Sequence, residues 1–225
     1  MQTHSTDMPG SCGPGPPPFW LFMGTNKGNL AIIIPDWARL ENMSTVRFIG
    51  DLHLGHKNIA AFSGPERGGI TNVDEHDAWI VEQWNSVCSK NDVIWVLGDV
   101  CMDRSKLPLL KKMKGNKHLI LGNHDEFTLD TYAPYFNKIH GFIRCKGMWL
   151  SHAPVHPQEL RGKLNIHGHC HKQIIKDDHR YVCVSVEQVN GKPLSLEEIR
   201  NGNAYKDLSA ARVNDLNLRH SRPAR

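Results

Sequence analysis

Val46-Arg47-Phe48-Ile49-Gly50-Asp51-Leu52-His53 joins an apolar run of strand length to a glycine, a carboxylate and an imidazole. Short apolar runs that end at glycine are typical of buried β-strands. The chain repeats this arrangement four more times, and each run ends in a cluster drawn from Asp, His, Asn and Gly: Val93–Asp99, His118–Asp125, Met148–His152 and Leu164–His171. The repetition predicts several strands whose ends carry polar side chains.

Helical patterns separate these predicted strands. Asn72 and Glu75 resemble an N-cap pair, and the apolar residues after them share one helical face: Ile80, Trp84, Val87 and Cys88. A shorter helix is expected over Lys106–Lys114, and Ser195-Leu196-Glu197-Glu198 is a capping box that opens a helix to about Asn203. Because strands and helices alternate, we expect one α/β domain over residues 44–204, with a late strand at Tyr181–Val186.

The two ends of the chain differ in composition from this domain. Residues 1–43 form an N-terminal extension, which is rich in Gly and Pro and is expected to be flexible at least to residue 18. Its apolar patches, Phe19–Met23 and Ala31–Ile34, leave two interpretations open: they pack on the domain, or they belong to an accidental extension before Met43. Residues 205–225 are expected to be a polar tail.

Composition narrows the class of protein. The chain has 225 residues, 40% of them hydrophobic, and a net charge of +4, which is too small to indicate a nucleic-acid partner. No apolar segment is long enough to cross a membrane. The six cysteines form no C-x-x-C pair and no secretory signal is evident, so we expect a cytoplasmic protein with free thiols.

The polar clusters carry the chemistry. In open α/β sheets ligands bind at the carboxyl ends of strands, so these side chains are expected to converge. In Asp51-x-His53 and His169-x-His171 the gap of one residue would place both side chains on one side of an extended chain. Asp99 has two carboxylate oxygens and could bridge two ions. The oxygen and nitrogen donors suit Mn, Fe, Zn, Ni or Mg, whereas the Cys170 thiol is expected to point away from its neighbours and be buried.

The order D-x-H, G-D, G-N-H-D, H and G-H-x-H resembles that of the calcineurin-like metallophosphoesterases, and Gly55-His56-Lys57-Asn58 is similar to a small bacterial or phage-type branch. The resemblance implies two mixed β-sheets packed as a sandwich and flanked by helices. It implies two divalent metal ions, most readily manganese, and a hydroxide that bridges them. Asp51, His53 and His171 would hold the first ion, Asn123, His152 and His169 the second, and Asp99 both. His124 would be catalytic, and Asp125 would orient it.

The substrate is less well defined by the sequence. We expect a phosphate ester of a small molecule or nucleotide, with a phosphodiester slightly favoured, because few extra cations are available to neutralise a dianionic monoester. Arg104 and Asn58 are candidate substrate-binding residues. The alternatives are a nuclease or a protein phosphatase of the same family, whereas a non-catalytic scaffold is disfavoured because every expected ligand is present.

Overall fold

The computed structural model describes residues 23–26, 29–32, 44–59 and 64–202. The chain divides into two compact units, Met1–Asn42 and Met43–Arg225. In the first unit, β1 (Met23–Asn26) and β2 (Asn29–Ile32) pair antiparallel. The Pro/Gly-rich segment over residues 1–18 and the tail over residues 205–225 lie outside the described residues, so the predictions for these segments remain untested.

The second unit contains two mixed sheets, as predicted. The five-stranded sheet has the order β11-β3-β4-β5-β6, with β3 (Val46–Ile49), β4 (Val93–Leu97), β5 (Asn116–Ile120) and β6 (Lys138–His140) parallel and β11 (Leu194–Ser195) antiparallel to β3. The four-stranded sheet has the order β10-β9-β8-β7. Here β8 (Met148–Ser151), β9 (Asn165–His167) and β10 (Tyr181–Cys183) run parallel, and β7 (Ile143–Cys145) is antiparallel to β8.

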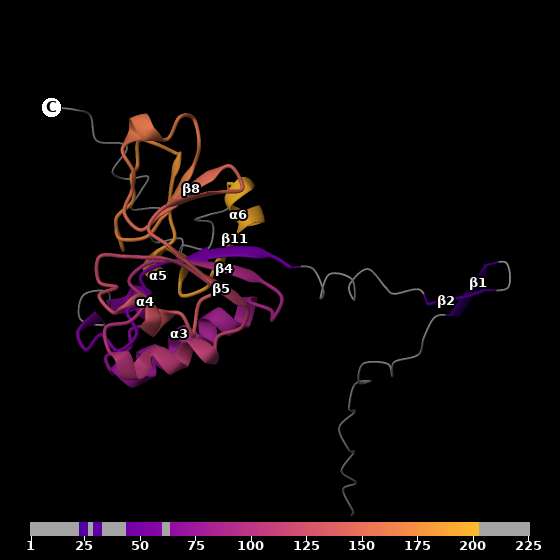
Figure 1. The fold of residues 1–225 in the computed structure, drawn as a ribbon, viewed down its shortest axis with the longest axis horizontal. Helices are drawn as coiled ribbons and strands as arrows, with labels where there is room; N and C mark the ends of the chain where they lie inside the picture. Colours follow the sequence, from indigo (N-terminus) through magenta and orange to yellow (C-terminus); the bar gives the residue numbers. More distant parts are fainter. Residues whose placement is uncertain (1–22, 27–28, 33–43, 60–63, 203–225) are drawn as a thin grey trace, which may run out of the picture. The chain divides into compact units, whose positions relative to one another are not determined.

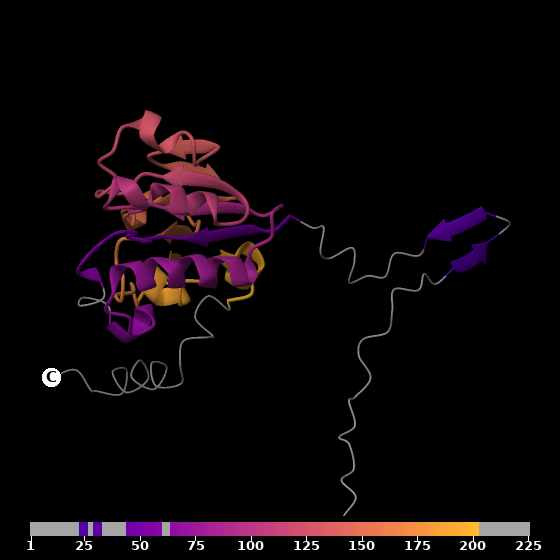
Figure 2. The same ribbon diagram turned by 90° about the horizontal axis from the view of Figure 1, so that it is seen from below.

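Two hydrophobic clusters pack against the two faces of the five-stranded sheet. Between the sheets, Phe48, Leu97 and Ile120 of the five-stranded sheet pack with residues of the other sheet, including Leu150 and Ile166. On its other face the five-stranded sheet is covered by α3 (Val73–Val87), the 3₁₀ helix η2 (Arg104–Lys111) and α4 (Leu129–Tyr132). Figure 1 shows α3 and α4 on the side of this sheet away from β8, and Figure 2 shows α3 alongside β3. The result is the predicted sandwich.

The long helix α3 forms where the sequence predicts it. Asn72 caps its first turn by accepting hydrogen bonds from the backbone N–H groups of Asp74 and Glu75. Those two carboxylates also favour the positive end of the helix dipole. Ile80 and Trp84 are fully buried against the sheet, and burial of such side chains contributes about 1.5–3 kcal/mol each.

The shorter helices differ in extent from the predictions. The segment predicted as a helix over Lys106–Lys114 is the 3₁₀ helix η2, in which Pro108 removes a backbone donor. The capping box at Ser195 and Glu198 is present, but α6 (Leu196–Arg200) ends before Asn201. The remaining short elements are the 3₁₀ helices η1 (Gly64–Arg67) and η3 (Pro157–Glu159), and α5 (Val186–Val189).

Beyond the strand ends, backbone hydrogen bonds continue to join the loops that carry the polar clusters. The amides of Asp51 and His53 donate to the carbonyls of Gly98 and Asp99. Gly50 bonds with Val184 and Val186, which links the end of β3 to the segment after β10. These bonds bring the carboxyl ends of strands from both sheets to one place.

Candidate metal centre

The backbone at the strand ends is turned rather than extended. Non-glycine residues rarely adopt positive φ, yet five candidate ligands do so: Asp51 (59°), His53 (50°), Asp99 (54°), His169 (66°) and His171 (49°). Such conformations cost of order 1–3 kcal/mol each and cluster at functional sites. The expectation that one-residue gaps act through extended chain is therefore wrong. The strands have already ended, so alternation of side chains does not apply, and left-handed turns bring these residues together.

Asp51, His53 and His171 form the first group of candidate metal ligands (the first ligand group). One potential ligand atom from each lies within 4.8 Å of those of the other two. The rings of His53 and His171 are stacked with their centroids 5.1 Å apart. Both ring nitrogens of His53 are buried and have no hydrogen-bond partner in the described part of the chain. A buried imidazole without a partner costs free energy, so this geometry fits a cation.

Asn123, His152 and His169 form the second group of candidate metal ligands (the second ligand group). Nε2 of His152 lies 2.9 Å from Oδ1 of Asn123 and 3.1 Å from Nδ1 of His169. Nδ1 of His152 lies 2.8 Å from the carbonyl oxygen of Leu97, and the N–H that this nitrogen donates leaves a lone pair on Nε2. Lone pairs of the group therefore converge where a cation would satisfy them.

Asp99 lies between the two groups. Its Oδ2 is 3.6 Å from Nε2 of His53 and 3.4 Å from Nε2 of His152. This position allows one carboxylate to serve both groups. Asp51 also extends toward the second group, because ligand atoms of Asp51, Asp99 and His152 lie within 4.8 Å of one another. The sequence predicted sharing only at Asp99.

Burial shifts the titration of these side chains in directions that suit a cation. Desolvation raises the pKa of Asp51 to about 6, although nearby His152 and His171 oppose the shift. Desolvation and the charge of Arg67 lower the pKa of His53 to about 2, so this imidazole is neutral and keeps a lone pair. A buried carboxylate is stabilised by an adjacent positive charge. The residues therefore fit a divalent ion electrostatically as well as geometrically.

Glycines allow the strand ends to approach one another. A Cβ atom added at Gly122 would lie 2.2 Å from Oδ1 of Asp99 and 2.5 Å from its backbone nitrogen. One added at Gly168 would lie 2.6 Å from Oδ2 of Asp51. Real Cβ atoms do not make contacts this short, so each glycine leaves room for a candidate ligand.

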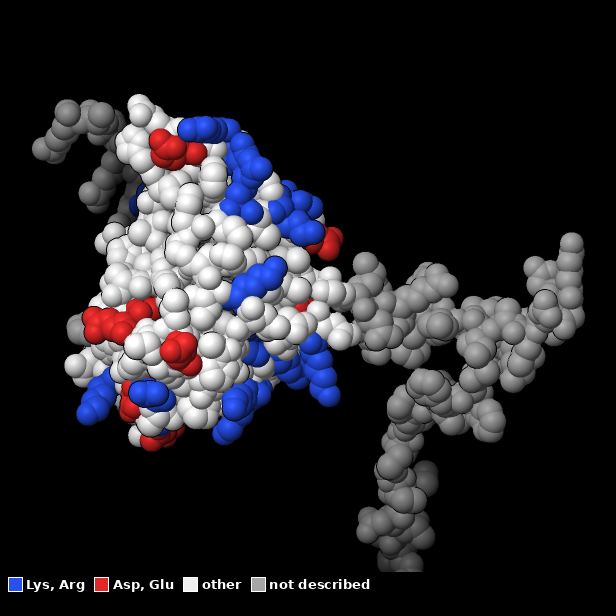
Figure 3. Space-filling model, viewed as in Figure 1, with Lys and Arg blue, Asp and Glu red and all other residues white. Residues whose placement is uncertain are grey.

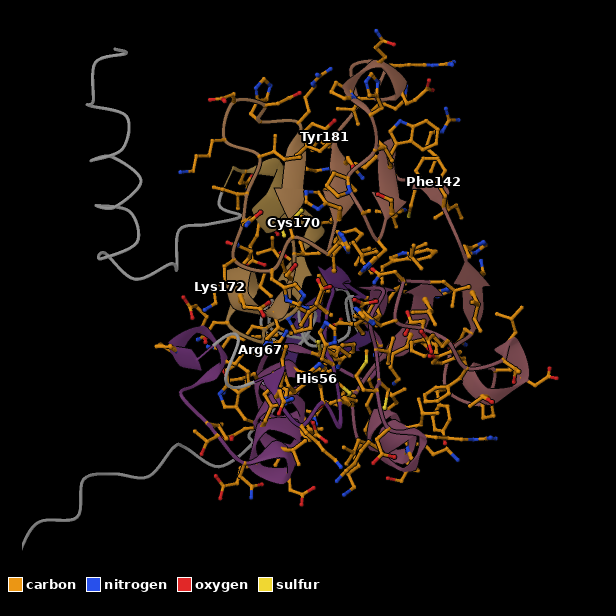
Figure 4. The ribbon with its side chains drawn as sticks, turned by 90° about the vertical axis from the view of Figure 1, so that its left-hand side faces the viewer. His56, Arg67, Phe142, Cys170, Lys172 and Tyr181 are labelled. Atoms are coloured by element: carbon orange, nitrogen blue, oxygen red, sulfur yellow. The ribbon has the colours of Figure 1, made fainter. Side chains whose placement is uncertain are left out.

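A cavity of about 600 Å³ adjoins both ligand groups. It is lined by His53, His56, Ile59, His124, His169, Cys170, His171, Lys172 and Gln173. The labelled His56, Cys170 and Lys172 lie around the junction of the two sheets in Figure 4. Cys170 is half-buried and is among the residues that line the cavity, so the expectation of a buried thiol is wrong, whereas the direction of its Sγ stays a prediction.

His124 is exposed and lines the cavity, and its backbone N–H donates to Oδ1 of Asp99. Asp125 does not have the expected geometry for orienting His124. The Asp125 carboxylate instead accepts hydrogen bonds from other groups: the backbone N–H of Asp99, Val100 and Gly122 and the hydroxyl of Tyr132. The Asp125 carboxylate therefore links the end of β4 to the end of β5, because it accepts hydrogen bonds from backbone N–H groups that follow both strands.

The two candidate substrate residues lie elsewhere. Arg104 is exposed at the start of η2, Asn58 is exposed, and neither is among the residues that line the cavity. The sequence analysis instead missed His56, Lys172 and Gln173. His56 belongs to the Gly55–Asn58 motif, and Lys172 directly follows the last G-H-x-H histidine, so membership of a motif or proximity to one was the available signal.

Two charged residues behind the first ligand group were also missed. Oε1 of Glu187 lies 2.9 Å from Nδ1 of His171 and 2.8 Å from Nε of Arg67. Burial raises the pKa of the Glu187 carboxyl, but the bond from His171 and the charge of Arg67 outweigh burial and hold the pKa well below its usual range. Nothing in the local sequence distinguishes Arg67 from an ordinary surface charge.

Comparison with known proteins identifies the family. The sequence profile of the calcineurin-like phosphoesterases matches residues 44–223. The chain belongs to the calcineurin-like phosphoesterase family. Members are metal-dependent hydrolases of phosphate esters and usually bind two divalent ions, which agrees with two ligand groups that share Asp99.

Three proteins that are similar to this phosphoesterase each match about 70% of its chain. The Gene 66 protein of Mycobacterium phage L5 is 30% identical over 197 residues, which span 70% of this chain and 93% of the phage protein. The uncharacterized protein MJ1445 of Methanocaldococcus jannaschii is 27% identical over 173 residues, 70% of this chain and 90% of that protein. The crystal structure of AQ665 from Aquifex aeolicus, a protein of unknown function, matches with a TM-score of 0.58 and 27% identity, covering 71% and 99% of the two chains. No helix in the described ranges has the length and apolar character that a membrane crossing needs.

Proposed function

We propose that this phosphoesterase hydrolyses a phosphodiester of a small molecule or nucleotide with two divalent ions bound. The observation that carries the proposal is the position of Asp99 between two ligand groups, beside a cavity that His124 also lines. Asp51, His53 and His171 would hold one ion, Asn123, His152 and His169 the other, and Asp99 both. We propose manganese, since the donors are oxygen and nitrogen atoms.

Bound divalent ions would supply Lewis acidity and lower the pKa of a water molecule toward neutrality. The protein supplies the geometry. Asp99 and Asp51 place negative charge where two cations would otherwise repel each other. The rings of His53 and His152 are buried, which excludes bulk water from that side of the centre.

His124 is suited to act as the general acid. Its ring is exposed on the cavity wall, while its backbone is fixed by the hydrogen bond to Asp99. A proton held at the imidazole could pass to the oxygen of the departing group, a contribution typically worth about 10²–10⁴ in rate. His56 also lines the cavity and provides a second imidazole for orienting the ester.

The charge of the cavity favours a diester. Lys172 is the one Lys or Arg among the described residues that line it, and its ammonium lies 3.1 Å from Oε2 of Glu66. The Glu66 carboxylate offsets the positive charge of Lys172, and a dianionic monoester would need such positive charge for its binding. The absence of Arg104 from the cavity lining also argues against the protein-phosphatase alternative, in which an arginine would contact the phosphate.

One observation favours a short nucleic-acid strand as an alternative diester. Residues 138–163 include five Lys or Arg residues, at 138, 144, 146, 161 and 163, and one acidic residue, Glu159. Figure 3 shows Lys and Arg side chains gathered on the half of the domain that holds β8. Such a surface could attract a phosphate backbone. We also propose a reducing compartment such as the cytoplasm, in which the cysteines would remain free thiols.

A metal-reconstitution assay tests the proposal. Chelated protein should be inactive on bis(p-nitrophenyl) phosphate, and Mn²⁺ should restore turnover. The matched monoester, p-nitrophenyl phosphate, should react no faster. His124→Ala should lose turnover but retain metal, whereas Asp99→Ala should lose metal as well. Full activity in demonstrably metal-free protein would refute the metal requirement, and a monoester preference above tenfold, about 1.4 kcal/mol, would refute the diester.

A further inference from the structure

A buried chain of charged and polar side chains begins behind the first ligand group. Glu187, in α5, is buried, and its Oε1 contacts both Nδ1 of His171 and Nε of Arg67. A carboxylate only accepts hydrogen bonds. Nδ1 of His171 therefore carries the proton of this contact, and in the neutral ring the lone pair lies on Nε2. Glu187 thus determines which His171 nitrogen is free to bind a cation.

The other end of the ion pair fixes the backbone of Asp51. Arg67 is fully buried, and its guanidinium donates to the carbonyl oxygens of Asp51 at 2.6 Å and Leu52 at 3.2 Å. Asp51 has a φ of 59°, so these bonds hold a residue in an unfavourable conformation. One ion pair between residues 120 positions apart therefore holds two ligands of the same group.

The chain continues to the cavity wall. Nη1 of Arg67 lies 3.2 Å from Nε2 of His76, and Nδ1 of His76 lies 3.3 Å from Oδ1 of Asp77. Both oxygens of Asp77 accept the backbone N–H of Gly55 at 3.1 Å. Gly55 precedes His56, which lines the cavity. In Figure 4 the labelled Arg67 lies close to His56 on the same side of the domain.

We propose that the Arg67–Glu187 pair is a positioning unit, which sets the orientation of His171 and the backbone of Asp51 so that the first ligand group is preorganised for a divalent ion. This inference rests on the proposed metal centre. A purely structural pair is the competing explanation, but replacement of a buried ion pair by apolar residues is often neutral or stabilising. Stability alone therefore does not account for a pair in which Glu187 contacts His171 and Arg67 contacts the backbone of Asp51.

Glu187→Met tests the inference with little change in size. Oε1 of Glu187 makes both contacts, to His171 and to Arg67. A methionine has no oxygen to accept either proton, so the neutral His171 ring is no longer held with its lone pair on Nε2. We expect Mn²⁺ affinity at the first ligand group to fall by about 10–100-fold, the usual effect of removing such a partner, while the second site changes much less. Mn²⁺ titration calorimetry measures both sites. Affinity within twofold of wild type at both sites would overturn the inference.

The double variant Arg67→Met/Glu187→Leu separates positioning from stability. If the pair positions ligands, this variant should retain cooperative unfolding and still lose first-site affinity. A folded double variant with wild-type affinity would overturn the inference. Asp92→Asn is the matched control. Asp92 is buried, its Oδ2 lies 3.2 Å from Nε of Arg47, and neither residue belongs to a ligand group. It should bind Mn²⁺ as wild type does.

A measurement without metal keeps this inference separate from the proposed function. ¹⁵N NMR of the His171 ring at alkaline pH should show the proton on Nδ1 in metal-free wild-type protein and a change in the tautomer population in Glu187→Met. The same tautomer in both proteins would contradict the role of Glu187. Failure of wild-type protein to bind any divalent ion would instead refute the proposed metal centre, whatever the NMR result.

Discussion

Gly122→Ala should damage the centre although it adds one methyl group. The new Cβ would meet Oδ1 of Asp99 at 2.2 Å and its backbone nitrogen at 2.5 Å, whereas ordinary contacts begin at 3.4 Å. Asp99 must therefore move by about 1 Å, which exceeds the tolerance of about 0.5 Å for a functional constellation. Overpacking of this kind costs about 1–3 kcal/mol. For a domain of this size the melting temperature should fall by about 2–12 °C.

Gly141→Ala is the matched control. A Cβ at Gly141 has no neighbour within 4 Å, and neither glycine has φ in the left-handed region. Only the available space differs, so Gly141→Ala should change stability by less than about 0.5 kcal/mol. Thermal unfolding of both variants without metal, followed by Mn²⁺ titration, gives stability and affinity together. Equal stability and equal affinity in the two variants would refute the packing argument.

Three further predictions follow from other residues. Asp125→Asn should lower stability by about 1–3 kcal/mol in denaturant titrations, because an amide cannot accept all the donors that this carboxylate now satisfies; an unchanged midpoint would contradict this. Burial raises the pKa of Cys88, Cys101 and Cys183 to about 12. Since unfolded thiols ionise near pH 9 and folded ones do not, stability should fall above pH 9, by up to about 1.4 kcal/mol per pH unit for each thiol; replacement of these residues by Ser or Ala should flatten that slope. A chain that begins at Met43 should keep turnover and melting temperature, and an insoluble or inactive product would show that residues 1–42 belong to the folded domain.

The sequence predicted the strands whose apolar runs end in polar clusters. Val46–Ile49 and Val93–Leu97 have the predicted bounds, because all their residues except Arg47 are apolar and most are buried between layers. The strands β6, β7 and β11 were missed. They are two or three residues long and contain polar residues, so they show neither a period nor an apolar run.

The sequence identified candidate ligands but not how they are held. Positive φ at Asp51 and His171 depends on contacts between distant loops, and no local pattern encodes it. The Arg67–Glu187 pair joins residues 120 positions apart, so its partners become visible only in the fold. Asp125 was assigned to the nearest catalytic candidate because it is adjacent in sequence, whereas its carboxylate is directed to the end of β4.

Anomalous diffraction from crystals equilibrated with Mn²⁺ would test the two-ion centre most directly. Two Mn²⁺ ions should appear, one contacted by Asp51, His53 and His171 and the other by Asn123, His152 and His169. The Asp99 carboxylate should contact both ions. A single ion, no ion, or ions that leave Asp99 without contact would contradict the assignment.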